Sequence, residues 1–224
     1  MQVLLVPRSA DDPATLLLRE EAKARNIAVW EGSDGDMRRM SPSGEQSAPA
    51  LAMVGPKLTQ NLQELLSRGG VIWLLHRAAY PSNVGFCIRT AEVSGAEGVI
   101  VDATEFGHEQ RSRVSHVTMG ADRVMPVLWQ SSEATLAAAK SAKLRIVAIE
   151  DVGQQAPHDV DLTGPVLMVV GNEREGIAPW LLNACDTVVR IPMAGFVPSY
   201  SLQAAVSAVA AERLRQLAER ASGK

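Results

Sequence analysis

From Val71 onward, short apolar runs alternate with helical segments, and this alternation restricts the possible folds more than any other feature of the sequence. Continuous apolar strands separated by helices are typical of a mostly parallel sheet that is covered on both faces. We therefore expect an α/β fold with helices on both faces of the sheet. The strands are expected at Val71–Leu75, Gly98–Val101, Val124–Leu128, Arg145–Ile149, Val166–Val170 and Thr187–Ile191, and the clearest helices at Val84–Ser94, Glu133–Ala142, Pro179–Ala184 and Leu202–Ala221.

Residues 1–56 differ from the rest of the chain and predict a small α/β module of their own. Turn-forming residues crowd the stretch 34–44, which we expect to be a flexible loop. Residues 57–70 are expected to form a connector helix, because leucines at helical spacing precede Gly69 and Gly70. Residues 71–224 then make the larger domain. The small module is expected to contain a strand at Val3–Val6, a helix at Pro13–Ala24 with Asp12 as its N-cap, and strands at Ile27–Trp30 and Ala50–Val54.

The composition is ordinary for a globular protein, with 46% hydrophobic and 21% charged residues in a chain of 224. The formal net charge is -3, so any contact with nucleic acid requires a local basic patch. Two cysteines, Cys87 and Cys185, are too few for a disulfide framework and leave at most a single bridge open. No apolar run approaches the roughly 20 residues that span a bilayer, and the start lacks a signal-peptide pattern. We therefore expect a cytoplasmic protein that makes no membrane contact.

Several common active-site signatures are absent from the sequence. It contains neither the glycine fingerprint of dinucleotide-binding folds nor a phosphate-binding loop with its lysine. Its four histidines are scattered and lack metal-ligand spacing, so no metal site is expected. The sequence also lacks the serine elbow of α/β hydrolases. These absences exclude most hydrolase and dehydrogenase functions.

Polar, glycine-rich segments follow three of the expected strands, at the edge where open parallel sheets bind their ligands. They are Tyr80–Arg89, Gly171–Gly176 and Pro192–Ser201. Each segment alone is equally consistent with ordinary turns and helix caps: Asn83 would then be an N-cap, and Glu173 an acid favoured by a helix dipole.

Taken in order, these segments resemble the three motifs of the SpoU/TrmH family of RNA ribose 2'-O-methyltransferases, which belong to the SPOUT class. The matching residues are Asn83-x-Gly85-x-x-x-Arg89-Thr90-Ala91, Gly171-x-Glu173-x-x-Gly176 and Ile191-Pro192-Met193-x-Gly195, and Thr118–Ala121 is similar to a further family stretch. The resemblance covers residues 71–215. It implies a C-terminal trefoil knot, S-adenosylmethionine as cofactor, an RNA substrate and a homodimer.

The resemblance also implies roles for individual residues. Arg89 would clamp a phosphate and support the developing alkoxide, because a guanidinium is too basic to accept a proton. Asn83 would position Arg89, and Glu173 would orient motif residues or accept a hydrogen bond. The residues expected to bind the cofactor are Ile149, Gly171, Asn172, Gly176, Ile191, Met193, Ser199 and Tyr200.

The third motif departs from the family, in which an asparagine ends a Ser-Leu-Asn sequence. A gapless register places Ser201 at that position and completes the expected catalytic set, whereas a two-residue insertion would place Gln203 there. We favour the gapless register, which needs no extra residues in a knotted loop. Two functions remain open: an active RNA methyltransferase, with ribosomal RNA favoured over transfer RNA, and a non-catalytic RNA-binding or assembly factor that keeps the fold.

RNA contacts are expected at two pairs of arginines. Arg38 and Arg39 lie in the N-terminal module, which resembles a shortened L30e-like RNA-binding module, and Arg111 and Arg113 are expected in a loop after Gly98–Val101. The small residues at 204–211 suit close helix packing. They are expected either to pack on the protein's own sheet or to form the homodimer interface together with the motif 1 helix.

Overall fold

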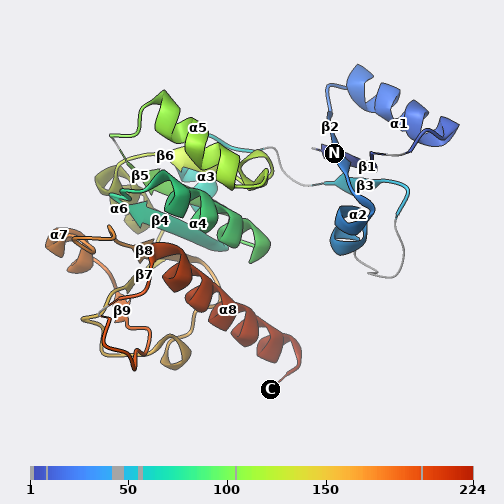
Figure 1. Ribbon diagram of the computed structural model, residues 1–224. Helices are drawn as coiled ribbons and strands as arrows, with labels where there is room; N and C mark the ends of the chain where they lie inside the picture. The colour runs from blue at the N-terminus through green and yellow to red at the C-terminus, as the bar shows by residue number, and fades with distance from the viewer. Residues whose placement is uncertain are drawn as a thin grey trace. The chain divides into compact units, whose positions relative to one another are not determined.

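The computed structural model describes residues 3–8, 10–41, 48–54, 58–103, 105–197 and 199–223, with Arg39 described by its backbone alone. The chain divides into two compact units, residues 1–58 and residues 59–224. The boundary expected at residue 56 falls in the undescribed stretch 55–57. Figure 1 shows the larger unit with its helices packed around one sheet.

The sheet of the larger unit has six strands in the order β6-β5-β4-β8-β7-β9. Every neighbouring pair in it is parallel, as the uninterrupted apolar runs predicted. The strand expected at Val124–Leu128 begins only at Val127, because the amides of Val124 and Met125 donate to Ala121 O and continue the turn that starts with the 3-10 helix Ala121–Arg123. The strands are β4 (Val71–His76), β5 (Gly98–Asp102), β6 (Val127–Trp129), β7 (Arg145–Ile149), β8 (Val166–Val170) and β9 (Thr187–Val189).

Helices cover both faces of this sheet and bury a separate apolar cluster on each. One face carries α4 (Pro81–Val93), α5 (His108–Val117) and α8 (Leu202–Ala221), and Figure 1 shows α4 lying between the other two. The opposite face carries α3 (Leu62–Leu66), α6 (Ser132–Ser141) and α7 (Pro179–Leu182). Alternate residues of β4 point to opposite faces: Trp73 joins the first cluster, and Ile72 and Leu74 join the second.

Two expectations for the larger unit are corrected by the structure. The connector helix is the short α3, and Leu65 and Leu66 are buried in the core of the larger unit, so α3 packs the sheet and belongs to that unit. The segment that carries Arg111 and Arg113 is the helix α5, not a loop. This helix escaped prediction because Val114 is its one buried residue and most of its other side chains are polar.

The smaller unit is a three-stranded sheet in the order β2-β1-β3 with two helices. Its elements are β1 (Val3–Pro7), α1 (Pro13–Ala24), β2 (Ala28–Gly32), α2 (Asp34–Met40) and β3 (Leu51–Met53). Asp12 caps α1 as predicted, since its carboxylate accepts a hydrogen bond from Thr15 N at 3.0 Å. The loop expected at 34–44 is wrong over the range of α2, where Ser33 and Asp36 form a capping box and Met37 is fully buried.

The chain after β7 runs alongside β9. Gln155 pairs with Val189 in parallel, and Glu150 N donates to Val189 O at 3.0 Å. A Cβ on Gly153 would lie 2.6 Å from the carbonyl carbon of Val189, so only glycine allows this approach. These backbone contacts lie in the part of the chain where the family resemblance places a trefoil knot. The knot itself stays a prediction.

Candidate functional site

Motifs 1 and 2 meet at the carboxyl edge of the sheet, because β4 and β8 are neighbouring parallel strands. The Asn83 amide, in the first turn of α4, donates to Glu173 Oε1 at 2.7 Å. The other carboxylate oxygen of Glu173 accepts a hydrogen bond from Ala79 N at 3.1 Å. Glu173 therefore fixes the start of α4 to the loop after β8. Glu173 thus holds the Asn83 amide, and the expected role of Asn83 in positioning Arg89 stays a prediction.

Asn172 makes a second connection between the same two loops. Its amide nitrogen donates to Arg77 O at 2.6 Å, while its side-chain oxygen accepts from the backbone of Arg174 at 2.8 Å and of Glu175 at 3.2 Å. Arg77 also pairs with Glu175 through an exposed contact of 3.2 Å. Asn172 thus shapes the loop, and it lies outside the pocket described below.

Gly171 and Gly176 are required by the close packing of the motif 2 loop. A Cβ on Gly171 would lie 2.2 Å from the carbonyl carbon of Gly176. Gly176 has a φ of +67°, and a Cβ there would lie 2.6 Å from Glu150 Oε2. The same Glu150 oxygen accepts a hydrogen bond from Ile177 N at 2.8 Å. Both glycines therefore act by allowing the loop to close against the end of β7, where Glu150 lies.

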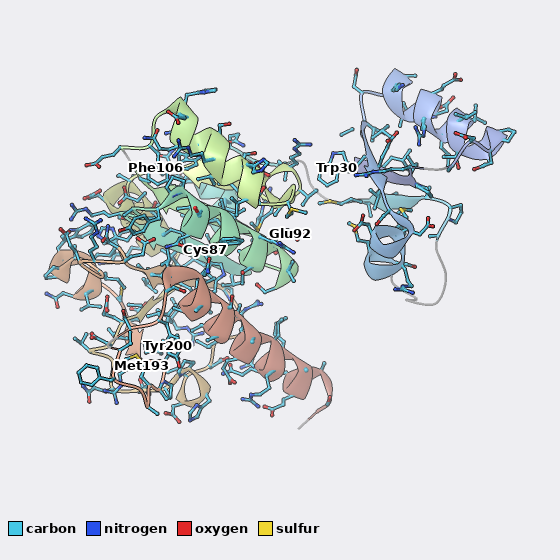
Figure 2. All side chains as sticks on the ribbon, viewed as in Figure 1. Trp30, Cys87, Glu92, Phe106, Met193 and Tyr200 are labelled. Carbon is cyan, nitrogen blue, oxygen red and sulfur yellow. The ribbon has the colours of Figure 1, made fainter. Side chains whose placement is uncertain are left out.

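A pocket of about 110 Å³ opens beside these loops, between the end of β7 and the segment after β9. Tyr200 links the two ends of the segment between β9 and α8, since its hydroxyl donates to Pro192 O at 3.3 Å. Figure 2 shows Met193 and Tyr200 close together before α8. The lining residues are Ile149, Glu150, Asp151, Arg190, Ile191, Met193, Ser199, Tyr200 and Ala205. The pocket thus gathers five of the residues expected to bind the cofactor: Ile149, Ile191, Met193, Ser199 and Tyr200.

Sequence reasoning missed the polar part of this lining. Glu150 and Asp151 directly follow the apolar strand β7, and Arg190 directly follows β9. Their position directly after parallel strands could have identified them as candidate ligand-binding residues. The pocket sets two carboxylates beside the apolar side chains of Ile149 and Ile191. This chemistry suits a ligand that combines a flat apolar group with positive charge.

Arg89 lies on the exposed side of α4. It is six residues beyond Asn83, which places it about 9 Å further along the helix axis. Within the described part of the chain, no hydrogen bond or ion pair engages its guanidinium. Arg89 therefore presents a free positive charge to a ligand or to another chain.

Both candidates for the third motif lie at the start of α8. Ser201 is the N-cap residue of α8, is exposed, and makes no side-chain capping hydrogen bond. Gln203 is half-buried in the first helical turn, and its Oε1 is buried without a hydrogen-bond partner among the described residues. An acceptor left unpaired in this way is costly, which makes Gln203 as strong a candidate as Ser201.

The arginines expected to bind RNA differ in their surroundings. Arg38 is exposed on α2, and the side chain of Arg39 lies outside the described residues. On α5, Arg113 forms an ion pair with Glu109, which partly neutralises it. Arg111 instead places its guanidinium carbon 4.5 Å from the ring centre of Trp129.

Neither metal nor cysteine chemistry has support in the described structure. Within those residues, no group of three His, Cys, Asp or Glu side chains could hold a metal ion. Both cysteines are free, and burial raises the pKa of the Cys87 thiol and raises that of Cys185 to about 11. Neither thiol is therefore ionised near neutral pH. Of the helices that the structure describes, none is long and apolar enough to cross a membrane.

The fold of this chain is similar to that of RNA methyltransferases of known structure. An S-adenosylmethionine-bound rRNA methyltransferase from Sinorhizobium meliloti aligns with a TM-score of 0.67 at 23% identity, covering 96% of this chain and 80% of that one. The S-adenosylmethionine complex of AviRb, a SpoU methyltransferase from Streptomyces viridochromogenes, aligns with a TM-score of 0.64 at 23% identity, covering 97% and 83%.

The sequence matches the SpoU rRNA methylase family over residues 70–211, and the chain belongs to that family. The 23S rRNA (guanosine-2'-O-)-methyltransferase RlmB of Pseudomonas putida is 30% identical over 199 residues, 88% of this chain and 77% of the relative. RlmB of Pseudomonas aeruginosa is 30% identical over 210 residues, 92% of this chain and 84% of the relative. The predicted family and the predicted parallel α/β fold are confirmed.

Proposed function

We propose that the protein is an S-adenosylmethionine-dependent methyltransferase that modifies a ribose 2'-hydroxyl of RNA, with ribosomal RNA favoured over transfer RNA. The observation that carries this proposal is the pairing of Asn83 with Glu173 next to the pocket lined by Ile191, Met193 and Tyr200. The relatives named as 23S rRNA methyltransferases support the preference for ribosomal RNA.

The pocket residues fit the cofactor. Ile149, Ile191 and Met193 offer apolar contacts to an adenine ring, and Glu150 and Asp151 offer negative charge to an ammonium or sulfonium group. When bound there, S-adenosylmethionine supplies an electrophilic methyl group. The backbone packs closely beside this pocket, since a Cβ on Gly153 would clash with the backbone of Val189 and Arg190.

The other residues orient the RNA. Arg89 binds a phosphate next to the target ribose and stabilises negative charge that develops on the 2'-oxygen. Glu173 stays bound to Asn83 and Ala79, so it acts as a positioning residue. Ser201 or Gln203 offers the hydrogen bond that the family's asparagine would make, and the 2'-hydroxyl itself distinguishes RNA from DNA.

We also propose a homodimer formed by α4 and α8. The two helices pack side by side, with Thr90 Oγ1 3.4 Å from Ser207 Oγ. Together they expose apolar side chains and small residues, namely Phe86, Val93, Ala208, Ala211 and Leu214. Pairing this surface with a second copy would carry Arg89 of one protomer toward the site of the other.

We propose that the smaller unit binds RNA through Arg38 and Arg39, as its resemblance to a shortened L30e-like RNA-binding module implies. A protein that modifies bacterial ribosomal RNA works in the cytoplasm, where we place this chain. It needs neither a metal ion nor a membrane.

The test is transfer of a labelled methyl group from S-adenosylmethionine to an unmodified 23S rRNA transcript, followed by mapping of the methylated nucleotide. We expect a 2'-O-methyl product from the wild type. Arg89→Ala should abolish transfer and leave the affinity for S-adenosylmethionine within a few-fold, because Arg89 does not line the pocket. Retained transfer in this variant would remove Arg89 from the reaction.

A second candidate, a non-catalytic RNA-binding or assembly factor, rests on the missing asparagine of motif 3. The same assay separates the two functions. A folded protein that binds the transcript and never transfers a methyl group would support the non-catalytic function.

A further inference from the structure

The Arg111 guanidinium lies over the ring of Trp129 at the edge of the sheet. Its guanidinium carbon lies 4.5 Å from the centre of the indole ring, and its Nε donates to Phe106 O at 3.2 Å. Phe106 is buried and supports the indole from the side, with the two ring centres 6.0 Å apart. Two independent contacts therefore hold the Arg111 guanidinium over the indole ring.

The Arg111 side chain is nevertheless exposed and keeps its charge. Arg113 pairs with Glu109, Arg77 with Glu175, and Arg220 with Asp161. Among the described residues, no carboxylate pairs with Arg111. Its guanidinium carbon lies over the Trp129 ring and its side chain is exposed, so the guanidinium is accessible to a planar, electron-rich group.

The position of this pair relates it to the proposed active site. Trp129 is the last residue of β6, and β6 lies two strands from β4 in the sheet. Since neighbouring strands are about 4.8 Å apart, the pair lies about 10 Å across the carboxyl edge from the end of β4, which leads to Asn83. The pocket beside β7 and β9 lies on the other side of β4. Pocket, motif junction and Arg111–Trp129 pair thus follow one another along a single edge.

We propose that Arg111, supported by Trp129, is a stacking platform for an unpaired RNA base near the methylated nucleotide. This inference rests on the proposed function, because it takes RNA as the substrate. Bases in single-stranded RNA stack on guanidinium planes and aromatic rings, and stacking tolerates any base. The platform therefore selects for unpaired substrate without reading its sequence.

This stacking role differs from the phosphate contact that the sequence predicts for Arg111. The Arg111→Lys variant distinguishes the two roles. Lysine keeps the charge of Arg111 and loses its plane. The experiment measures the affinity of full-length Arg111→Lys for a short single-stranded RNA of mixed sequence over a range of salt concentrations. A second probe is the same ribose-phosphate strand without bases. Arg220→Lys, an exposed arginine far along α8, is the matched control.

We expect Arg111→Lys to bind the RNA with bases about 5-fold to 150-fold more weakly than the wild type, which corresponds to the loss of one stacked base. Its salt dependence and its affinity for the base-free strand should match the wild type, since the charge is retained. Arg220→Lys should match the wild type on both probes. Trp129→Leu should weaken binding in the same base-dependent way, with circular dichroism confirming its fold.

If Arg111→Lys binds both probes as tightly as the wild type, the stacking platform is overturned and Arg111 remains a phosphate contact. A wild type that binds neither probe overturns both the platform and the proposed function. A wild type that binds RNA and fails to methylate it overturns the proposed catalysis alone, because the base-dependent loss in Arg111→Lys is read from binding.

Discussion

At the residue scale, Glu173 is the side chain on which the geometry of the site depends most. Its two oxygens accept hydrogen bonds from Asn83 Nδ2 and Ala79 N. In Glu173→Gln, the amide can accept only one of these bonds, and its NH₂ group faces the other donor. We expect a loss of about 1–3 kcal/mol in the free energy of unfolding, together with a clear loss of methyl transfer.

Urea unfolding and the transfer assay on the same preparation check this prediction. Glu175→Gln is the matched control, because its exposed pair with Arg77 contributes at most about 1 kcal/mol. Equal effects of the two substitutions would show that Glu173 has no special positioning role.

Ser132 belongs to a buried polar cluster behind the motif 1 loop. Its hydroxyl donates to Asp102 Oδ2 at 2.5 Å and lies 2.7 Å from His76 Nδ1. Burial alone would raise the pKa of Asp102, yet the contacts with His76 and Ser132 outweigh it and hold that pKa below its ordinary value. We expect Ser132→Ala to lower the free energy of unfolding by about 1–3 kcal/mol at neutral pH.

The sign of the pH dependence follows from the lowered pKa of Asp102. Stabilisation by the ionised carboxylate is present above the unfolded-state value of about 3.9 and is lost as pH falls through the folded-state pKa. The difference between wild type and Ser132→Ala should therefore narrow in denaturant titrations below about pH 4. Ser131→Ala, which loses only its cap on Ala134 N, should show a cost that varies little with pH. A difference in unfolding free energy between wild type and Ser132→Ala that stays constant with pH would contradict the stabilising role of the ionised Asp102 carboxylate.

At the element scale, the helices and strands with the strongest sequence signals were predicted best. The strands β7 and β8 and the helices α1 and α8 were predicted with their observed bounds, because continuous apolar runs or strong capping and spacing signals define them. The helices α2 and α5 were missed because each buries a single side chain, Met37 or Val114, and the rest of the sequence resembles a loop.

The site was predictable in its residue types and not in its contacts. Motif order identified Asn83 and Glu173, whereas their mutual hydrogen bond depends on β4 and β8 being neighbours, which no local pattern specifies. The role of Gly171 likewise depends on a backbone approach from Gly176 that only the folded loop reveals.

The α4 and α8 helices provide a test of association. Ala211 is exposed on α8 and belongs to the surface proposed for the homodimer. A carboxylate there would be desolvated in a homodimer, so we expect Ala211→Glu to shift sedimentation toward the monomer. Ala137→Glu makes the same change at an exposed position of α6, on the opposite face of the sheet, and should sediment like the wild type. A wild type that already sediments as a 24.0 kDa species would exclude the dimer.

At the scale of the whole molecule, the proposed binding sites for cofactor and RNA are distributed over the two units. Every residue that lines the pocket proposed for the cofactor lies between Ile149 and Ala205, inside the unit that spans residues 59–224. That unit buries its apolar residues in two clusters drawn from its own elements. The smaller unit has a separate cluster built around Leu4 and Val6. Cofactor binding should therefore be independent of the smaller unit, whereas RNA binding should depend on both.

Removal of residues 1–58 tests this division. We expect the remaining chain to bind S-adenosylmethionine with an affinity within a few-fold of the full protein, as measured by calorimetry. Its affinity for an unmodified 23S rRNA transcript should fall, and the dependence on salt should become shallower, because each lost arginine–phosphate contact removes one released counterion. The Arg38→Lys variant of the full-length protein keeps the positive charge at this position, so the salt dependence of its RNA affinity should match that of the wild type. This control separates the loss of the arginine charge from the loss of the whole smaller unit. A shortened protein that is folded by circular dichroism yet no longer binds the cofactor would show that the smaller unit helps to shape the pocket.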